Sequence, residues 1–329
     1  MEKILECIPN FSEGADSAVI EKIALAIQSV SGVWLLHTDQ SPAANRTVIT
    51  FAGTPEAVVE AAFRAIKKAA ELIDMSRQEG VHPRIGATDV CPLVPLQGMS
   101  MEEADAYAQQ LGRRVGQELN IPVFLYEYSQ ALPYRKSLPQ IRKGQYEGLA
   151  AKMQLPEWAP DFGPREMNRS AGATVLGARR ILVAFNISLD TTDVQVAETI
   201  AQQMRTVSRS ESALPRLRAI GWYMADYGQA QVSFNLLDFR ETSPLQVWQR
   251  CAALAKALGV TLTGSEVIGL IPEACLLEAG DLALKEGDAA AGKDRISAAI
   301  AYMGLDQLKP FAPEEKILEY ALQKHSDIR

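Results

Sequence analysis

The apolar positions of the first half follow two alternating periods, one typical of strands and one typical of helices. Short apolar runs bounded by turn residues predict strands over 4–9, 33–39, 46–53, 88–96 and 121–128. Apolar residues spaced three and four apart predict amphipathic helices over 16–30, 54–73 and 101–120. The order is βαββαβ followed by a helix and a strand, which is an elaborated split βαβ unit.

The second half repeats this order. Strand patterns cover 179–189, two runs within 216–239 that meet at a turn near 226–228, and 261–271. Helix patterns cover 191–207, 243–260 and a segment from 272. The sequence therefore predicts an α+β protein of two ferredoxin-like (split βαβ) sandwich subdomains, each with helices over a mostly antiparallel sheet. We place their boundary between residues 1–178 and 179–329.

Residues 137–179 separate the two repeats and are rich in Pro, Gly and Arg, with little periodicity. A connection of this length inside a compact protein is usually functional or disordered. Trp158, Phe162 and four arginines argue against a solvated tether. This composition is equally consistent with a segment that forms part of a functional site and with a segment that spans the domains and has only a packing role.

Composition narrows the classes of function. The chain has 329 residues and a formal net charge of −7, which does not favour nucleic acid as a partner. The four cysteines show no CxxC spacing and fit small buried side chains in a reducing compartment. No signal peptide or membrane-spanning run is visible, so we expect a cytoplasmic protein without a membrane partner.

Several familiar sites are missing from the sequence. There is no phosphate-binding loop, dinucleotide fingerprint, HExxH motif, GxSxG elbow or cluster of His and Cys. We therefore predict no metal. What remains is a set of polar residues in loops next to the predicted strands, where functional sites usually form. These are Asn10, Phe11, Ser12, Glu13, Asp39, Asn45, Arg46, His82, Arg84, Asp89, Tyr126 and Glu127.

His82 is one of only three histidines and lies in the sequence GVHPRIGATDVCP, residues 80–92. The following proline biases its backbone toward an extended conformation. Imidazole titrates near neutral pH, which suits a base that must accept a proton and return it. Residue type and spacing alone leave a structural or surface role open.

Several long sequence blocks follow one another along most of the chain, among them CIPNFSEG, DQSPAANRTVITFAG, IDMSRQEGVHPRIGATDVCPLVPL, IGWYMADYGQAQVSFNLLDF and GSEVIGLIP. Together and in this order, they resemble the formiminotransferase domain of glutamate formimidoyltransferase. The resemblance implies transfer of a formimino group from N-formimino-L-glutamate to tetrahydrofolate, giving 5-formiminotetrahydrofolate and glutamate in histidine degradation. In animals the domain is fused to a cyclodeaminase domain, so the resemblance implies a stand-alone, monofunctional form here.

The resemblance also implies roles for residues. His82, in the motif HPR-x-G, would be the catalytic base. The chemistry further calls for a carboxylate beside the amidinium group, for which Asp39 and Glu127 are candidates, and for Arg46 and Arg84 on the carboxylates of glutamate. We expect the substrate site to comprise Asn10, Asp39, Asn45, Arg46, Arg84, Tyr126 and Glu127.

Tetrahydrofolate would be a co-substrate. The resemblance places its segment between Gly163-Pro164 and Gly172-Ala173-Thr174, and the folate residues would be Gly163, Pro164, Arg165, Asn168, Arg169, Gly172, Ala173 and Thr174. Lys136, Arg142 and Lys143 would add basic charge nearby, unless these cations are only a solvated face. The family further implies a ligand tunnel between the subdomains and a homodimer.

Two other functions remain open at this point. The transferred group could be formyl, with 5-formyltetrahydrofolate as donor to glutamate, because formyl and formimino differ by one atom. The chain could also be a folate-binding protein without catalysis, although a binder would need no base at His82.

Overall fold

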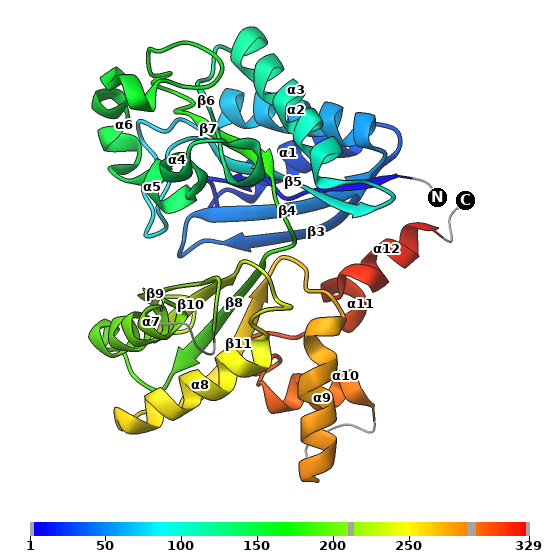
Figure 1. Ribbon diagram of the computed structural model, residues 1–329, viewed down its shortest axis with the longest axis vertical. Helices are drawn as coiled ribbons and strands as arrows, with labels where there is room; N and C mark the ends of the chain where they lie inside the picture. The colour runs from blue at the N-terminus through cyan, green and yellow to red at the C-terminus, as the bar shows by residue number, and fades with distance from the viewer. Residues whose placement is uncertain (1–2, 210–213, 288–293, 327–329) are drawn as a thin grey trace. The chain divides into compact units, whose positions relative to one another are not determined.

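A computed structural model describes residues 3–209, 214–287 and 294–326, which divide into two compact units, Met1–Arg180 and Ile181–Arg329 (Figure 1). Each unit has its own sheet and its own apolar core. The α+β class with two subdomains, expected from the repeated strand and helix order, is confirmed.

Unit 1 is built on a seven-stranded mixed sheet. Its strands are β1 (Ile4–Cys7), β2 (Asn10–Phe11), β3 (Val33–Ser41), β4 (Arg46–Gly53), β5 (Thr88–Gln97), β6 (Val123–Leu125) and β7 (Thr174–Ala178). β1 and β2 act as one interrupted strand between β4 and β5, and β3 pairs with the other edge of β4. The resulting order β5, β1/β2, β4, β3 is that of a split βαβ sandwich.

Three helices cover one face of this sheet. They are α1 (Ser17–Gln28), α2 (Pro55–Leu72) and α3 (Met101–Glu118). Asp16 caps the start of α1, and Ser100 with Glu103 forms a capping box at the start of α3, which satisfies backbone N–H groups that have no partner inside the helix. Their apolar stripes bury Ile49, Phe51 and their neighbours, as the predicted helical spacing requires.

The segment predicted to lack periodicity is folded. It contains α5 (Leu138–Arg142), α6 (Gln145–Gln154) and β7, and α4 (Pro133–Lys136) precedes it. β7 pairs in parallel with both β5 and β6, and so extends the antiparallel core of the sheet. The predicted strand over 121–128 is shorter than expected, because it ends at Leu125 and a 3₁₀ turn, Glu127–Ser129, follows.

The second face of the sheet is only partly covered within unit 1. α5 and α6 bury Ile141, Leu149 and Met153 against the β5–β7–β6 end. Among the residues described for this unit, no helix packs on the same face over β2 and β4. Val90 packs with the apolar residues of α5 and α6, so it lies on this second face. Asn10 pairs with Val90 and Val48, so its side chain points to the same face. Arg46 is two residues before Val48 in β4 and points to this face as well. Polar side chains therefore meet where the helix cover ends.

Unit 2 has a four-stranded antiparallel sheet in the order β11-β8-β10-β9, the same split βαβ arrangement. Its strands are β8 (Val183–Leu189), β9 (Leu217–Met224), β10 (Gln229–Leu236) and β11 (Leu262–Ile268). Its helices are α7 (Val194–Arg209), α8 (Pro244–Ala257), α9 (Ala274–Glu286), α10 (Arg295–Tyr302), α11 (Pro313–Lys316) and α12 (Leu318–Ser326). None of the helices in the described residues is both long enough and apolar enough to cross a membrane.

Candidate functional site

The loop before β5 carries His82 and is fixed at its far end by backbone contacts. The N–H of Ala87 donates to the Ala171 carbonyl at 2.8 Å, and the N–H of Ala173 donates to the Ile85 carbonyl at 3.0 Å. A Cβ atom on Gly86 would lie 2.1 Å from the Ala173 carbonyl oxygen, so only glycine allows this approach. The loop is thus held against the segment that leads into β7.

His82 is partly buried, and its environment favours the neutral imidazole. Nδ1 lies 2.9 Å from the carbonyl oxygen of Pro83, which can only accept, so Nδ1 carries the proton and Nε2 keeps its lone pair. Burial, and then the positive charges of Arg46 and Arg142, hold the pKa of His82 well below its ordinary value. At neutral pH this ring can accept a proton at Nε2.

Asp89 is the hub of the polar cluster beside His82. It is fully buried, Oδ1 accepts from the N–H of Ile85 at 2.9 Å, and Oδ2 accepts from Nη2 of Arg46 at 2.9 Å and from Nη2 of Arg142. Burial alone would raise the pKa of Asp89, but Arg142 and Arg46 outweigh it and lower it to about 2. The carboxylate is therefore ionised and joins the His82 loop to two arginines.

A shift in the register between β2 and β5 turns the side chain of Asp89 toward these partners. Asn10 of β2 pairs with Val90 and the next residue, Phe11, pairs with Thr88, so Asp89 is the extra residue of a bulge in β5. Regular alternation would turn Asp89 to the face covered by α1–α3. The bulge turns its side chain toward Arg46 instead, as bulges next to functional sites commonly do.

Asn10 and Arg46 are linked directly. The Asn10 side-chain oxygen accepts from Nε of Arg46 at 3.2 Å and from Nη2 at 2.9 Å. Burial lowers the pKa of Arg46 to about 10, so the guanidinium stays charged at neutral pH. The interruption between β1 and β2 places Asn10 here, because Ile8 turns its carbonyl to accept from the Asn10 amide.

Tyr126 directly follows β6, and its backbone N–H donates to the Leu176 carbonyl at 3.0 Å. Its side chain is buried, and the charge of Arg179 acts on it. Burial is the main reason that the pKa of Tyr126 rises to about 12, so the phenol keeps its proton. Arg142 also acts on its charge, which places Tyr126, Arg142 and Asp89 in one neighbourhood.

Two other residues predicted for the substrate site, Arg84 and Asn45, have structural contacts. Arg84 donates to both carboxylate oxygens of Glu147, at 2.7 and 3.2 Å, and to the Gln78 carbonyl at 2.7 Å. Asn45 has a left-handed backbone and ties the β3–β4 turn to Gly14 and to Glu79. Glu127 lies in the 3₁₀ turn after β6. Arg84 and Asn45 thus brace the loop that carries His82.

Asp39 and His37 lie together on β3. Oδ2 of Asp39 is 3.7 Å from Nε2 of His37, two residues earlier on the same side of the strand. Asp39 pairs with Val48, and so lies on the same face as Asn10. The structure therefore places this carboxylate on the face of the cluster.

The end of the segment assigned to folate by resemblance contacts the His82 loop. Gly172 forms a bridge with Gly86, and Thr174 begins β7 beside Val123. Asn168 turns back to accept from the Ala171 N–H at 2.9 Å. Gly163 has a left-handed backbone against Gly116. The remaining members are Pro164, Arg165, Arg169 and Ala173, of which Arg165 and Arg169 are exposed.

The cluster thus unites four predicted residues, Asn10, Arg46, His82 and Tyr126, with two that were not expected in it. Asp89 was noted only as a polar loop residue and Arg142 as part of a basic supply for folate. The sequence did contain an indication that Asp89 is functional, because Asp89 is an acidic residue within the apolar run TDVCPLVPL. Nothing in the local sequence indicated the contact of Arg142, 53 residues away.

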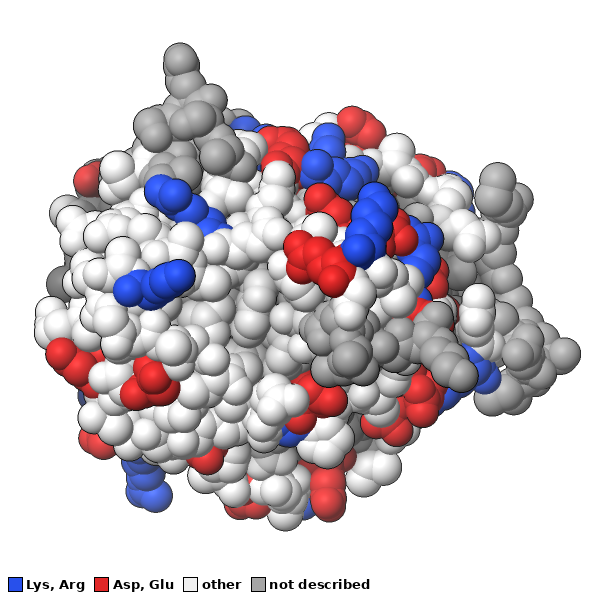
Figure 2. All heavy atoms as spheres, turned by 90° about the horizontal axis from the view of Figure 1, so that it is seen from below, with Lys and Arg blue, Asp and Glu red and all other residues white. Residues whose placement is uncertain are grey.

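Figure 2 shows one face of the molecule, on which Lys and Arg side chains lie among Asp and Glu side chains and do not form a patch of one sign. A surface that binds phosphate backbones requires clustered cations. Among the described residues, no group of three or more His, Cys, Asp and Glu is arranged to hold a metal ion.

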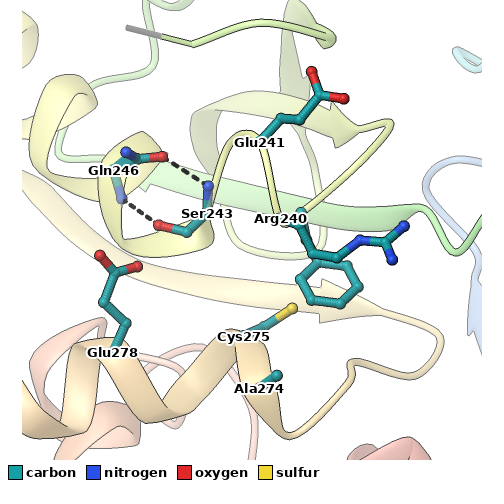
Figure 3. A pocket seen from close by; sticks show the side chains of 8 residues that line it. Arg240, Glu241, Ser243, Gln246, Ala274, Cys275 and Glu278 are labelled. Carbon is teal, nitrogen blue, oxygen red and sulfur yellow. Dashed lines mark hydrogen bonds between the residues drawn. The ribbon is translucent and has the colours of Figure 1, made fainter.

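Unit 2 has a hollow of about 370 Å³ between α8 and the start of α9 (Figure 3). Ser243 and Gln246 in its wall satisfy each other as a capping box, with bonds of 2.9 and 3.3 Å. Arg240 is paired with Asp238, and burial raises the pKa of the Cys275 thiol well above its ordinary value. Ser243, Gln246 and Arg240 thus have structural partners and the thiol is a poor nucleophile, so we place the candidate site in unit 1.

Unit 2 also holds a buried polar cluster on the face of its sheet opposite α7 and α8. Glu266 accepts from Gln231 at 3.0 Å, Asn186 at 3.3 Å and Tyr227 at 2.8 Å, and it pairs with Lys309 at 3.2 Å. Both carboxylate oxygens are engaged, so these contacts account for the burial of the charge.

Family comparisons cover both units. Residues 4–179 match the N-terminal subdomain of the formiminotransferase domain, and residues 184–323 match the formiminotransferase domain. Formimidoyltransferase-cyclodeaminase of Gallus gallus is 45% identical over 98% of this chain, which spans only 60% of that relative. Glutamate formimidoyltransferase of Streptococcus pyogenes serotype M1 is 42% identical, over 88% of this chain and 95% of its own length. The glutamate formimidoyltransferase of Thermoplasma acidophilum is 40% identical, over 84% of this chain and 90% of its own length. Since family models match most of both units and relatives this similar align over nearly their whole length, the chain belongs to the formiminotransferase domain family.

Proposed function

We propose that this protein is a glutamate formimidoyltransferase, which moves the formimino group of N-formimino-L-glutamate to N5 of tetrahydrofolate. The observation that carries the proposal is the environment of His82, whose Nδ1 lies 2.9 Å from the Pro83 carbonyl oxygen and whose burial, with the charges of Arg46 and Arg142, favours the neutral imidazole. The names of the relatives from Streptococcus pyogenes and Thermoplasma acidophilum support the same reaction. Tetrahydrofolate is a co-substrate in this proposal.

His82 would act twice in the reaction. Nε2 accepts the proton of N5 while N5 bonds to the formimino carbon, which becomes tetrahedral. The imidazolium then returns a proton to the glutamate nitrogen as the bond from that nitrogen to the carbon breaks. Glutamate leaves with its amine, and the formimino group remains on N5, so atoms and charge balance.

The neighbours of His82 set its proton affinity and its place. Arg46 and Arg142 lower its pKa, which keeps the ring neutral before the attack and makes the imidazolium a strong acid for the second step. Asp89 fixes the loop through the Ile85 N–H. Asp39, on the same face, remains a candidate for the carboxylate beside the amidinium group.

The remaining expectations belong to the same proposal. Gly163–Thr174 would contribute to the folate site, and its bridge to Gly86 supports a position beside the base. We further propose that residues 1–178 and 179–329 are the two subdomains of a cytoplasmic homodimer. The expected ligand tunnel stays a prediction from the family.

A steady-state assay with two substrate pairs tests the reaction. Purified protein is incubated with tetrahydrofolate and N-formimino-L-glutamate, and separately with 5-formyltetrahydrofolate and glutamate. Turnover of the first pair supports the proposal. Turnover of the second pair alone would change the transferred group to formyl, and binding of folate without turnover of either pair would indicate a binding protein.

A further inference from the structure

Arginines in unit 1 differ in how their charge is compensated. Arg84 is paired with Glu147, and Arg135 is paired with Asp161, one carboxylate for each guanidinium. Arg46 and Arg142 share the single carboxylate of Asp89, and both donate to its Oδ2. The other oxygen of Asp89 is occupied by the Ile85 N–H. The cluster therefore has one guanidinium charge more than its carboxylate balances.

This excess lies out of water, because Asp89 is fully buried and the side chains of Arg46 and Arg142 are largely buried. A positive cluster that is largely out of water is costly unless an anion compensates it. The chemistry of the cluster thus calls for an anionic ligand.

The two arginines on Asp89 have different amounts of hydrogen-bonding capacity left. Arg46 donates from Nε and Nη2 to Asn10 and from Nη2 to Asp89, and its side chain is 7% exposed. Arg142 donates from Nη2 to Asp89, and its buried Nε has no hydrogen-bond partner. Its side chain is 12% exposed. Arg84 and Arg135 also have a buried, unpartnered Nε, so the shared carboxylate is what distinguishes Arg142.

The position of Arg142 fits a ligand that reacts at His82. It comes from the end of α5, at the border where the helix cover of the second face stops. Its charge acts on both His82 and Tyr126. A carboxylate on Arg142 would place the rest of a small amino acid beside the imidazole, and a guanidinium binds carboxylates in a planar fork.

We propose that Arg142 binds a carboxylate of the glutamate moiety, in place of the role expected for Arg84. This rests on the proposed function only for the identity of the amino acid. Arg142 is a binding residue here, and Asp89 is the residue that orients it. The ligand carboxylate supplies the negative charge that the Arg46–Asp89–Arg142 cluster lacks.

Calorimetric titration with L-glutamate tests the proposal without requiring turnover. We expect R142Q to weaken binding of L-glutamate at least about 10-fold, while R135Q binds as the wild type does. Arg135 is the matched control, because it is also buried, paired with an aspartate and unpartnered at Nε. R142K keeps a charge for Asp89 and serves if R142Q does not fold; it should also bind more weakly, because an ammonium cannot form the fork.

The outcomes separate this proposal from the reaction. If R142Q and R142K bind L-glutamate like the wild type, Arg142 is not the carboxylate partner, whatever the protein transfers. If the wild type binds L-glutamate through Arg142 but transfers no formimino group, the binding proposal stands and the proposed reaction fails. In an active enzyme, the KM for N-formimino-L-glutamate should rise in R142Q and the KM for tetrahydrofolate should not.

Discussion

Gly86 and Gly172 form a backbone bridge that joins the loop of His82 to the segment before β7. A Cβ atom on Gly172 would lie 2.2 Å from the Ile85 carbonyl oxygen and 2.7 Å from Cα of Gly86. Gly172 also has a φ of +68°, a conformation that other residues adopt at a cost. The base and the proposed folate segment are therefore parts of one rigid contact.

Replacing this glycine should be costly. We expect G172A to lower the free energy of unfolding by more than the roughly 1 kcal/mol of a left-handed alanine, because the backbone must also move away from Ile85. G259A is the control, since Gly259 has a φ of +77° with no atom within 4 Å of a Cβ. Denaturant unfolding compares the two variants; equal losses would show that the close approach is not tight in solution.

Replacing the base should affect chemistry more than folding. We expect H82A to lower kcat by about 100-fold or more while tetrahydrofolate still binds. H325A is the control, because His325 lies on α12 in unit 2, remote in the sequence from the cluster. Near-normal turnover of H82A would remove His82 from the mechanism.

The pH profile should report the environment of His82. Its pKa lies well below 6.5, so the ring is already neutral at pH 6.5, and kcat/KM should fall only at lower pH as Nε2 becomes protonated. R142Q removes one of the charges that lower this pKa, so the acid limb should move to higher pH. A limb that stays in place in R142Q would show that Arg142 does not act on the base.

Asp89 should contribute to stability in a pH-dependent way. Its pKa is about 2 in the folded protein and near 3.8 when unfolded, so its contribution is complete above about pH 4 and is lost as pH falls toward 2. That difference corresponds to about 2 kcal/mol. D89N should flatten this part of the stability curve and destabilise the protein at pH 7 by about 3–5 kcal/mol, because two buried guanidiniums lose their carboxylate. Urea unfolding at several pH values measures both effects.

Arg84 should matter for stability and not for substrate affinity. It is 7% exposed and its donors go to Glu147 and to the Gln78 carbonyl, so R84Q should cost about 1–3 kcal/mol. The KM for N-formimino-L-glutamate should stay within about threefold of the wild type. A large rise in this KM with unchanged stability would restore the role that the sequence indicated for Arg84.

The outcome for individual residues shows what local sequence can and cannot predict. Apolar runs of strand length located β3 and β4, and apolar residues spaced three and four apart located α2 and α3. The bulge at Asp89 breaks the alternation of side chains along β5, so the direction of Asp89 could not be read from spacing. Arg84 and Arg142 are both arginines near the base in sequence, and only the tertiary partners, Glu147 and Asp89, distinguish them.

The parallel pairing of β7 between β5 and β6 has a consequence for how the protein acquires its site. β7 enters the sheet after an excursion that starts at Gln97 and ends at Thr174, so its pairing is strongly non-local. Contacts of this kind close large loops and tend to form late in folding. The backbone bonds that fix the His82 loop come from Ala171 and Ala173, at the start of this strand. A chain that has paired only β1–β5 would thus have a sheet but would lack the backbone bonds that hold the His82 loop to Ala171 and Ala173. Competence for catalysis would then mark the completion of folding in unit 1.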